Sequence, residues 1–262
     1  MTVELLDKTR RINRLLQEAH TSKLVFNDIC EEIGRILQSD VLVISKKGKV
    51  LGVAQNPAVE PLEELNHKVG DRLSDEINHR LLHVLSTNEN VNLVMFGFSQ
   101  ETADRYFSIV MPIVISGERL GTVLMYRMDR GYGIEDVILG EYSTTVVGLE
   151  MMRSLKEEDA ERMHKRQLAK SAIGTLTGAE REAMTHVLED LNGWEGILVA
   201  GKIADRCGIT RSVIVNALRK FESAGIFETH SSGMKGTYIR ILNESVWDEM
   251  GVQEPGMHEP EA

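Results

Sequence analysis

The chain has 262 residues, 42% of them hydrophobic, which is enough for two domains with buried cores. No apolar run reaches the roughly 18 residues of a membrane-spanning helix, and the charged N-terminus lacks the apolar stretch of a secretory signal. The two cysteines, Cys30 and Cys207, lie far apart and outside any paired motif. This usage predicts a reducing, cytoplasmic location, with neither a disulfide nor a zinc site.

The net charge of −10 argues at first against nucleic acid as a partner, but the charge is unevenly distributed. The segment 200–243 carries seven Lys or Arg residues against three carboxylates. The tail from Glu244 onward carries six carboxylates and no Lys or Arg. Positive charge is therefore concentrated in one short segment, where phosphate contacts remain feasible.

The N-terminal half predicts helices and hairpins in alternation. Helical spacing of apolar residues predicts a helix over 5–19 and a second over 27–38, with Asn27 as the N-cap of the second. Alternating or β-branched runs bounded by turns predict two hairpins, with strands at 41–45, 49–54, 107–115 and 119–127. Between the hairpins, we expect 62–85 to be helical in pieces and 88–100 to be irregular.

The segment 134–171 predicts either one very long helix or two helices with a break near Ser154. Its first half is apolar, whereas 153–166 is dense in charges of both signs. A helix that changes from core-like to solvated suits a rigid connector that also pairs with a second copy of itself.

Helix, hairpin, helices, hairpin and long helix in this order indicate an antiparallel sheet with helices at its ends or on one face. Sensor domains of the GAF or PAS type have this organisation and enclose a small-molecule pocket between the sheet and its covering loops. The expected fold class is α+β, with four parts. They are a GAF-like effector-sensing and dimerisation domain (1–153), a helical linker (154–176), a winged helix-turn-helix domain (177–243) and an acidic tail (244–262).

The C-terminal third contains a helix-turn-helix pattern. Thr177 and Glu180 have capping-box spacing before a helix that runs to about Leu191. In the segment 200–219, Ile203 and Ala204 are expected to face inward, Gly208 permits the turn, and Thr210 caps the second helix.

The second helix exposes side chains that suit a DNA groove, because Arg pairs with guanine or phosphate and Asn pairs with adenine. Two short strands, 226–229 and 236–242, follow as a β-wing, whose loop brings Lys235 to a phosphate. The predicted DNA contacts are Thr210, Arg211, Ser212, Val215, Asn216, Arg219, Lys220 and Lys235. The alternative is a helical hairpin whose basic residues are merely solvated.

The runs 203–206, 208–220, 222–225 and 233–238 resemble the CodY family of global transcriptional repressors. Shorter segments of the N-terminal half, at 6–13, 48–52, 117–122 and 145–148, also resemble that family. The resemblance implies a homodimer that binds promoter operators in double-stranded DNA. It also implies a GAF domain whose effectors are isoleucine, leucine or valine, and in many members GTP, with no other cofactor.

One departure from the family concerns the effector pocket. An Arg that grips the effector carboxylate is expected after the first hairpin, but 56–65 contains no Arg or Lys. Arg72, Arg80 or Arg105 could substitute, or the effector differs. The segment 95–99 also departs from the family, and it leaves Phe96 and Phe98 as candidates for the pocket wall, against plain core packing. No phosphate-binding loop indicates where GTP would bind.

Other chemistries find little support in the sequence. His79 and His83, with His67 nearby, have no third metal ligand at a defined spacing, so a solvated helix face is favoured over a metal site. Cys30 is the only thiol in the predicted sensor domain and lies on an apolar helix face, which argues against an enzyme. The remaining alternative is a constitutive dimeric DNA-binding protein whose sensor domain binds a different ligand or none.

Overall fold

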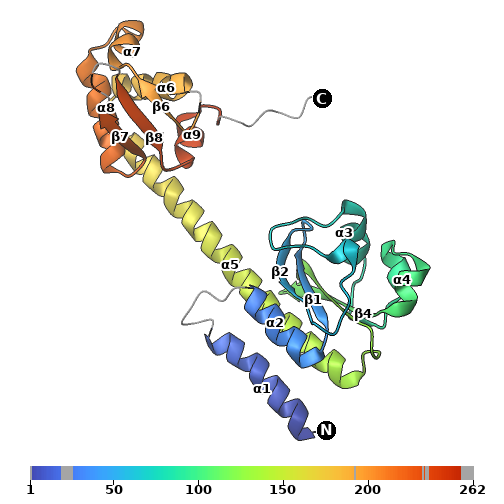
Figure 1. Ribbon diagram of the computed structural model, residues 1–262. Coiled ribbons are helices and arrows are strands. Elements are labelled where there is room, and N and C mark those ends of the chain that lie inside the picture. Colours follow the sequence, from blue (N-terminus) through green and yellow to red (C-terminus); the bar gives the residue numbers. More distant parts are fainter. Residues whose placement is uncertain (1, 19–25, 192, 232, 234–235, 255–262) are drawn as a thin grey trace. The chain divides into compact units, whose positions relative to one another are not determined.

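The computed structural model describes residues 2–18, 26–191, 193–231, 233 and 236–254 (Figure 1). The chain divides into two compact units, Met1–Leu155 and Lys156–Ala262. None of the helices in the described ranges combines the length and the apolar character needed to cross a membrane. Both units combine helices with antiparallel strands, so the predicted α+β class is confirmed.

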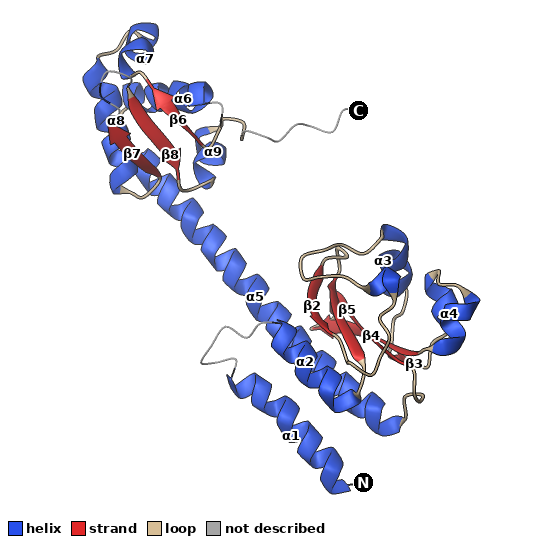
Figure 2. Ribbon diagram, in the orientation of Figure 1, coloured by secondary structure: helices blue, strands red, loops and turns tan. Residues whose placement is uncertain are grey.

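A five-stranded antiparallel sheet forms the centre of the N-terminal unit, in the order β2-β1-β5-β4-β3 (Figure 2). Its strands are β1 (Asp40–Ser45), β2 (Val50–Ala54), β3 (Asn88–Glu89), β4 (Phe107–Ile115) and β5 (Glu118–Arg127). Both predicted hairpins are present, and β5 joins them as the middle strand. Val123 of β5 pairs with Val43 on one side and Met111 on the other.

Two helices cover one face of this sheet, α2 (Phe26–Leu37) and the first half of α5 (Ile134–Gly174), and α1 (Thr2–Glu18) packs on their outer side. Their apolar residues and those of β1, β4 and β5 form one buried cluster. Gly148 lets α5 lie close to the sheet, because a Cβ there would approach the side chain of Ile115 to 2.8 Å.

The opposite face of the sheet is covered by the connection between the two hairpins. This connection contains η1 (Glu63–Leu65), α3 (Asp75–Leu82), η2 (Leu93–Phe96) and α4 (Gln100–Arg105). As expected, 62–85 is helical in pieces, with η1 and α3. The region 88–100, expected to be irregular, contains the short strand β3 and the short helix η2. Its buried apolar side chains pack on Leu42, Ile44, Val110 and Leu124 of the sheet. We call this cluster the outer-face cluster.

The helix α2 begins at Phe26, so the expectation that Asn27 is its N-cap is wrong. Asn27 lies in the first turn, and its Oδ1 accepts a hydrogen bond from the backbone N–H of Val53 at 3.0 Å. The outer edge of β2 is bonded elsewhere too: Val50 N donates to Asp71 O and Gly70 N donates to Val50 O, each at 2.9 Å. The edge strand β2 is therefore partly covered.

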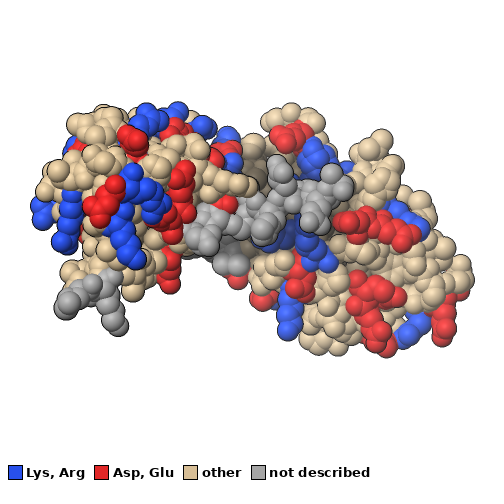
Figure 3. Space-filling view, turned by 90° about the horizontal axis from the view of Figure 1, so that it is seen from above, with Lys and Arg blue, Asp and Glu red and all other residues tan. Residues whose placement is uncertain are grey.

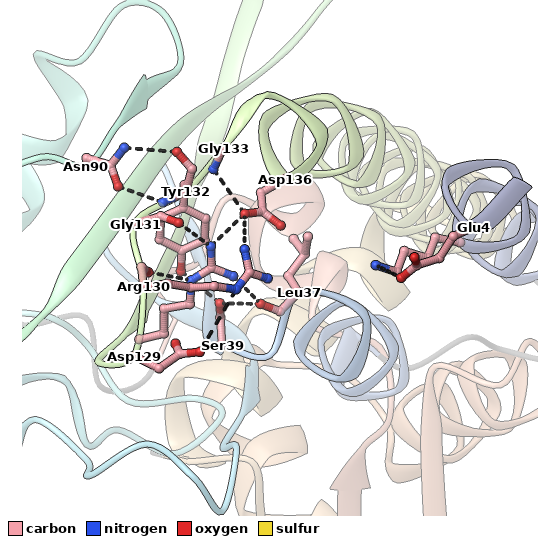
Figure 4. Close-up of polar contacts among 12 residues, drawn as sticks. Glu4, Leu37, Ser39, Asn90, Asp129, Arg130, Gly131, Tyr132, Gly133 and Asp136 are labelled. Carbon is pink, nitrogen blue, oxygen red and sulfur yellow. Dashed lines mark hydrogen bonds and ion pairs between the residues drawn. The ribbon is translucent and has the colours of Figure 1, made fainter. Parts of the chain in front are cut away.

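A buried polar network holds the start of α5 (Figure 4). Arg127, at the end of β5, is 1% exposed and donates to Asp136 Oδ2 at 2.6 Å and to the carbonyl of Leu37 at 2.7 Å. Its guanidinium lies 4.1 Å from the ring centroid of Tyr132, whose hydroxyl donates to Ser39 at 2.8 Å. The network therefore joins the end of α2, the end of β5 and the first turn of α5.

The helix α5 is continuous from Ile134 to Gly174, which settles the choice left open by the sequence in favour of one helix. Its first half contributes Val137, Leu139 and Val147 to the N-terminal unit. Its last turns contribute Ala169, Ala172 and Ile173 to the core of the C-terminal unit.

Among its described residues, the C-terminal unit combines four further α-helices with a three-stranded antiparallel sheet, in the order β6-β8-β7. Its elements are α6 (Gly178–Leu191), β6 (Glu195–Leu198), α7 (Ala200–Cys207), α8 (Arg211–Ser223), β7 (Phe227–Ser231), β8 (Thr237–Ile241) and α9 (Ser245–Met250). Strand β6 was not anticipated, although the apolar run after Trp194 marks it.

The structure corrects part of the expected acidic tail 244–262. Ser245–Met250 forms α9, and Val246, Trp247 and Met250 are buried in the same core as α6 and α8. Glu249 also pairs with Arg166 of α5. The sequence missed α9 because carboxylates surround only three buried apolar residues. Residues 255–262 lie outside the described part of the chain.

Candidate nucleic-acid interface

The helices α7 and α8 form the predicted helix-turn-helix. Ile203 and Ala204 are buried on α7, as expected. Gly208 ends α7 with φ of +64°, a left-handed conformation that glycine adopts without strain. Ile209 packs against the core after this turn, and its N–H donates to the carbonyl of Ala204 at 3.0 Å. The sequence therefore predicted the turn and the inward faces of both helices.

Thr210 occupies the N-cap position of α8 with an extended backbone, but its side chain makes no capping hydrogen bond. Thr210 is thus the N-cap residue of α8, as expected, but the capping hydrogen bond from its side chain is absent. The Thr210 side chain is exposed beside Arg211 and Ser212 at the start of α8. Since the first N–H groups of a helix carry a partial positive charge, this end of α8 favours a negatively charged partner.

One face of α8 is buried and the other is open. Ile214, Ala217, Leu218 and Phe221 are buried in the core of the unit. Arg211, Ser212, Asn216 and Arg219 are exposed, and Val215 is half-buried among them. The structure therefore brings together six of the eight predicted contact residues along α8. They are Thr210, Arg211, Ser212, Val215, Asn216 and Arg219. Guanidinium, amide and hydroxyl groups in this arrangement can donate to base edges and phosphates.

Lys220 is placed differently from the other predicted contacts. Its Nζ donates to Glu180 Oε2 at 2.7 Å and to the carbonyl of Thr175 at 2.9 Å. Glu180 lies in the first turn of α6, and Thr175 follows the end of α5. The Lys220 ammonium is thus engaged inside the unit.

A second ion pair joins the first helix of the helix-turn-helix, α7, to α6. Arg206 of α7 donates to both carboxylate oxygens of Asp190 in α6, at 2.8 and 2.6 Å. This bidentate hydrogen bond from Arg206 lowers the pKa of the Asp190 carboxyl. Within the basic segment found in the sequence, Arg206 and Lys220 therefore donate hydrogen bonds to carboxylates of the protein, and Arg240 forms an ion pair with Glu228.

The wing consists of β7 and β8, as predicted, with β6 added on the far side of β8. The rings of Tyr238 in β8 and His230 in β7 are nearly parallel, with their centroids 6.3 Å apart. The Tyr238 hydroxyl donates to Glu195 of β6 at 2.7 Å. The tip residue Lys235, a predicted phosphate contact, lies outside the described residues.

Acidic side chains lie between the basic ones on the faces of both units seen in Figure 3. On the exposed side of α8, Arg211 and Arg219 supply positive charge. Such a distribution agrees with a net charge of −10 for the whole chain.

The candidate pocket residues Phe96 and Phe98 are 2% and 5% exposed and belong to the outer-face cluster of the N-terminal unit. They pack with Leu62, Leu65 and Leu73 from the segment that covers the sheet. A cavity of about 960 Å³ lies elsewhere, between α2 and the segments 55–57 and 66–69, and neither Phe96 nor Phe98 lines it.

The three arginines considered as substitutes for the family's effector-binding arginine all have partners within the protein. Arg72 donates to the carbonyl of Lys47 and Arg80 to that of Met95, both at 3.3 Å. Arg105 pairs with Glu60.

Asp40 is a buried carboxylate at the start of β1, on the same face as Leu42 and Ile44. It is 1% exposed, and its Oδ1 accepts from the N–H of Asn56 at 2.6 Å. The hydroxyl of Tyr126, on the neighbouring strand β5, interacts with this carboxylate, although Oδ2 accepts no hydrogen bond among the described residues. Burial raises the pKa of the Asp40 carboxyl. Sequence reasoning did not identify Asp40, whose only signal was a carboxylate beside an apolar strand.

The His79 and His83 rings lie 4.3 Å apart, and His83 Nδ1 is 2.8 Å from the carbonyl of His79. Within the described ranges, no group of three or more metal-ligating side chains comes together.

Comparison with known proteins covers both units. The model of the CodY GAF-like domain matches residues 4–175, and that of the CodY helix-turn-helix domain matches residues 194–253. The global transcriptional regulator CodY of Clostridium botulinum (strain Eklund 17B / Type B) is 46% identical over 256 residues, which cover 94% of this chain and 97% of that protein.

The global transcriptional regulator CodY of Clostridium beijerinckii is also 46% identical over 253 residues, with 94% of this chain and 97% of that protein covered. A solved structure, the cofactor-binding GAF domain of the nutrient sensor CodY from Clostridium difficile, is 36% identical with a TM-score of 0.42. It covers 56% of this chain and 97% of that chain. The relatives are named as regulators of transcription and not as enzymes. With a GAF-like unit, a long helix and a helix-turn-helix unit in this order, the chain belongs to the CodY family of global transcriptional regulators.

Proposed function

We propose that this protein is a nutrient-responsive repressor that binds operators in duplex DNA through the exposed side of α8. The carrying observation is the open face of α8, where Arg211, Ser212, Asn216 and Arg219 project from a helix whose other face is buried. The N-terminal turn of α8 enters the major groove, as in other helix-turn-helix proteins, and the wing lies beside α8 on the sugar-phosphate backbone of the DNA. Repression follows from occupation of promoter sites in the cytoplasm.

Selection from a random duplex library tests this proposal without knowledge of the operator. The full-length protein should enrich one sequence and bind it at least about 10³-fold more tightly than bulk competitor at physiological salt. Equal affinity for enriched and random duplexes would contradict the proposed function.

We further propose that the effector is an amino acid with an apolar side chain, such as isoleucine, leucine or valine, bound at the outer-face cluster. Phe96, Phe98 and Leu62 offer an apolar wall. Beside it, the Asp40 carboxylate interacts with the Tyr126 hydroxyl but keeps an Oδ2 that accepts no hydrogen bond among the described residues, and a buried carboxylate gains from a charged donor such as an ammonium group. Since that oxygen is covered, the segment 55–66 must move to admit the ligand.

Thermal unfolding with each amino acid, and separately with GTP, tests the effector. Isoleucine, leucine or valine should raise the melting temperature of the wild type, since a ligand that binds only the folded state stabilises it. Asp40→Asn should reduce that shift, and Asp104→Asn, which changes an exposed carboxylate of α4 outside the segment 55–66, should not. The same ligands should tighten DNA binding, and DNA should tighten ligand binding by the same factor. We propose GTP as a second effector at a separate site.

The alternative is a constitutive DNA-binding protein whose sensor domain binds a different ligand or none. The occupied side chains of Arg72, Arg80 and Arg105 favour it, because none is available for a carboxylate without breaking a bond to the protein. Under this alternative, DNA affinity and melting temperature are unchanged by all four compounds.

We propose that the regulator acts as a homodimer. Ile134 and Ile138 are 78% and 48% exposed one turn apart on α5, and Val3 and Leu6 are 74% and 48% exposed on α1. A second copy would remove these apolar side chains from water. Sedimentation should show a dimer, and Ile138→Lys should weaken it.

A further inference from the structure

Lys220 lies in the last turn of α8, at the opposite end of the helix from Arg211 and Ser212. It is nine positions after Arg211, or about 14 Å along the helix axis at 1.5 Å per residue. Helix-turn-helix proteins read bases with the N-terminal part of the second helix. The position of Lys220 thus differs from that of Arg211, although both belong to the same basic segment.

Three elements meet at the Lys220 ammonium. It comes from the last turn of α8, Glu180 from the first turn of α6, and the Thr175 carbonyl from the residue after α5. The side chains of Lys220 and Glu180 are 36% and 9% exposed, so the contact is partly shielded from water. A carbonyl near a helix C-terminus and a carboxylate both favour a cation.

Glu180 has a second role at this junction. Its Oε2 accepts from the N–H of Thr177 at 2.8 Å, and its own N–H donates to Thr177 Oγ1 at 3.3 Å. This is the capping box predicted from the sequence. The same oxygen therefore starts α6 and holds α8, and the Lys220 ammonium together with the Thr177 N–H lowers the pKa of the Glu180 carboxyl.

Direct packing between α5 and α8 is incomplete beside this junction. A groove of about 450 Å³ separates them, lined by Leu168, Ser171 and Ala172 of α5 and by Arg219, Ser223 and Ala224 of α8. Because side-chain packing leaves this gap, the polar link to Thr175 is a defined connection between the end of α5 and α8.

We propose that Lys220 is a positioning residue that fixes the orientation of α8 against the α5–α6 junction through Glu180 and Thr175. The proposal rests on DNA binding through α8, and it replaces the phosphate contact expected from the sequence. A movement of the last turn of α5 is then transmitted to the reading helix through a charge-assisted hydrogen bond.

Glu180→Gln separates this role from simple electrostatics. Glutamine keeps the capping box but loses the charge that pairs with Lys220. If Lys220 and Glu180 acted only through long-range charge, removal of a carboxylate would tighten DNA binding. Positioning predicts the reverse, about fivefold weaker binding to the enriched duplex. Lys220→Met should weaken binding by a similar factor, Lys220→Arg should restore most of it, and the double variant should be no worse than the weaker single variant.

The salt dependence of binding provides the second readout. Lys220→Met should leave the slope of log affinity against log salt unchanged, whereas loss of a phosphate contact reduces it by about 0.9. Arg219→Gln is the matched control, as the exposed neighbour on α8, and should flatten the slope. A flattened slope for Lys220→Met, with Glu180→Gln binding as tightly as the wild type or better, would overturn the proposal.

Amide hydrogen exchange tests the positioning without DNA. In the full chain, Lys220→Met and Glu180→Gln should both speed exchange over the last turn of α8 and over 175–181, and Arg219→Gln should not. Unchanged exchange in both variants would also refute the link. A wild-type protein that prefers no duplex would contradict the proposed function alone, since the exchange data still decide whether Lys220 orders α8.

Discussion

Arg127 and Asp136 form an ion pair, 2.6 Å between Nη2 and Oδ2, that joins the middle strand of the sheet to the first turn of α5. The neighbouring residue, Tyr126, faces the other side of β5 and belongs to the outer-face cluster. Two consecutive strand residues thus contact the candidate effector face and the start of the long helix. The outer-face cluster and the start of α5 are therefore linked through adjacent residues of one strand.

Asp136→Asn should destabilise the N-terminal unit at neutral pH by about 3 kcal/mol, because it leaves the Arg127 guanidinium buried without its counter-charge. Burial alone raises the pKa of Asp136, but the bonds from Arg127 and the Gly133 N–H outweigh it and lower that pKa below 3.8. The stabilisation is therefore present above pH 3.8 and is lost as the pH falls through the lower folded-state pKa.

Urea unfolding followed by circular dichroism between pH 7 and 3 measures this effect. The difference between wild type and Asp136→Asn should shrink in acid. Asp129→Asn is the control, since Asp129 is 61% exposed and 4.0 Å from Arg130. A gap that stays constant with pH would show that Asp136 acts without its charge.

Gly236→Ala should destabilise the wing by about 2–3 kcal/mol. Gly236 has φ of +120°, and a Cβ there would lie 2.3 Å from the carbonyl oxygen of Leu198 in β6. Gly233→Ala, with φ of +61° and open space around its Cβ, should cost only about 1 kcal/mol. Both tryptophans lie in the C-terminal unit, so tryptophan fluorescence during urea unfolding reports on that unit alone. Equal losses for the two variants would contradict the close approach to β6.

Arg211→Ala should cost about 1–3 kcal/mol of binding to the enriched duplex and much less on random DNA, if its guanidinium reads a base. Titrations on both duplexes at one salt concentration measure the difference. Arg162→Ala, which removes a 73% exposed arginine from α5, is the control and should leave the ratio of affinities unchanged. Equal losses on both duplexes would assign Arg211 to a phosphate instead.

Lys235→Ala should weaken binding to all duplexes alike and reduce the salt slope by about 0.9, as expected for one phosphate contact in the wing. A loss confined to the enriched sequence would place Lys235 at a base edge.

Trp247→Ala should destabilise the C-terminal unit by about 3–5 kcal/mol, because Trp247 is 1% exposed in the core. Trp194, 41% exposed and 6.5 Å away ring to ring, remains as the fluorescent reporter. Trp194→Ala is the matched variant and should cost less. If Trp247→Ala unfolded at the wild-type urea concentration, α9 would be dispensable for the fold.

Local pattern was enough for much of this architecture. The two hairpins, the helix-turn-helix and the wing follow from apolar periodicity and turn residues, whereas the pattern over 134–171 left one long helix and two shorter helices open. The open face of α8 was also predictable, because residues three and four apart share a helix face. The order of the predicted elements was therefore sufficient to identify the architecture of both units.

The failures share a physical cause, which is the choice of partner by tertiary structure. Lys220 and Arg211 look alike in sequence, but only the fold brings Glu180, 40 positions earlier, to one of them. Asn27 looks like a helix cap, yet its oxygen bonds a strand 26 positions away. Asp40 loses its solvent only because a distant segment covers it. No local window contains these contacts.

The bond from Val53 to Asn27 also bears on how the chain avoids self-association while it folds. An uncovered strand edge offers its N–H and C=O groups to any other extended chain and seeds aggregates. At one edge of this sheet several of those groups are already bonded, to Asn27 and to residues 70 and 71. At the other edge, β3 has only two residues. Both borders of the sheet therefore disfavour pairing with a foreign strand while the chain folds.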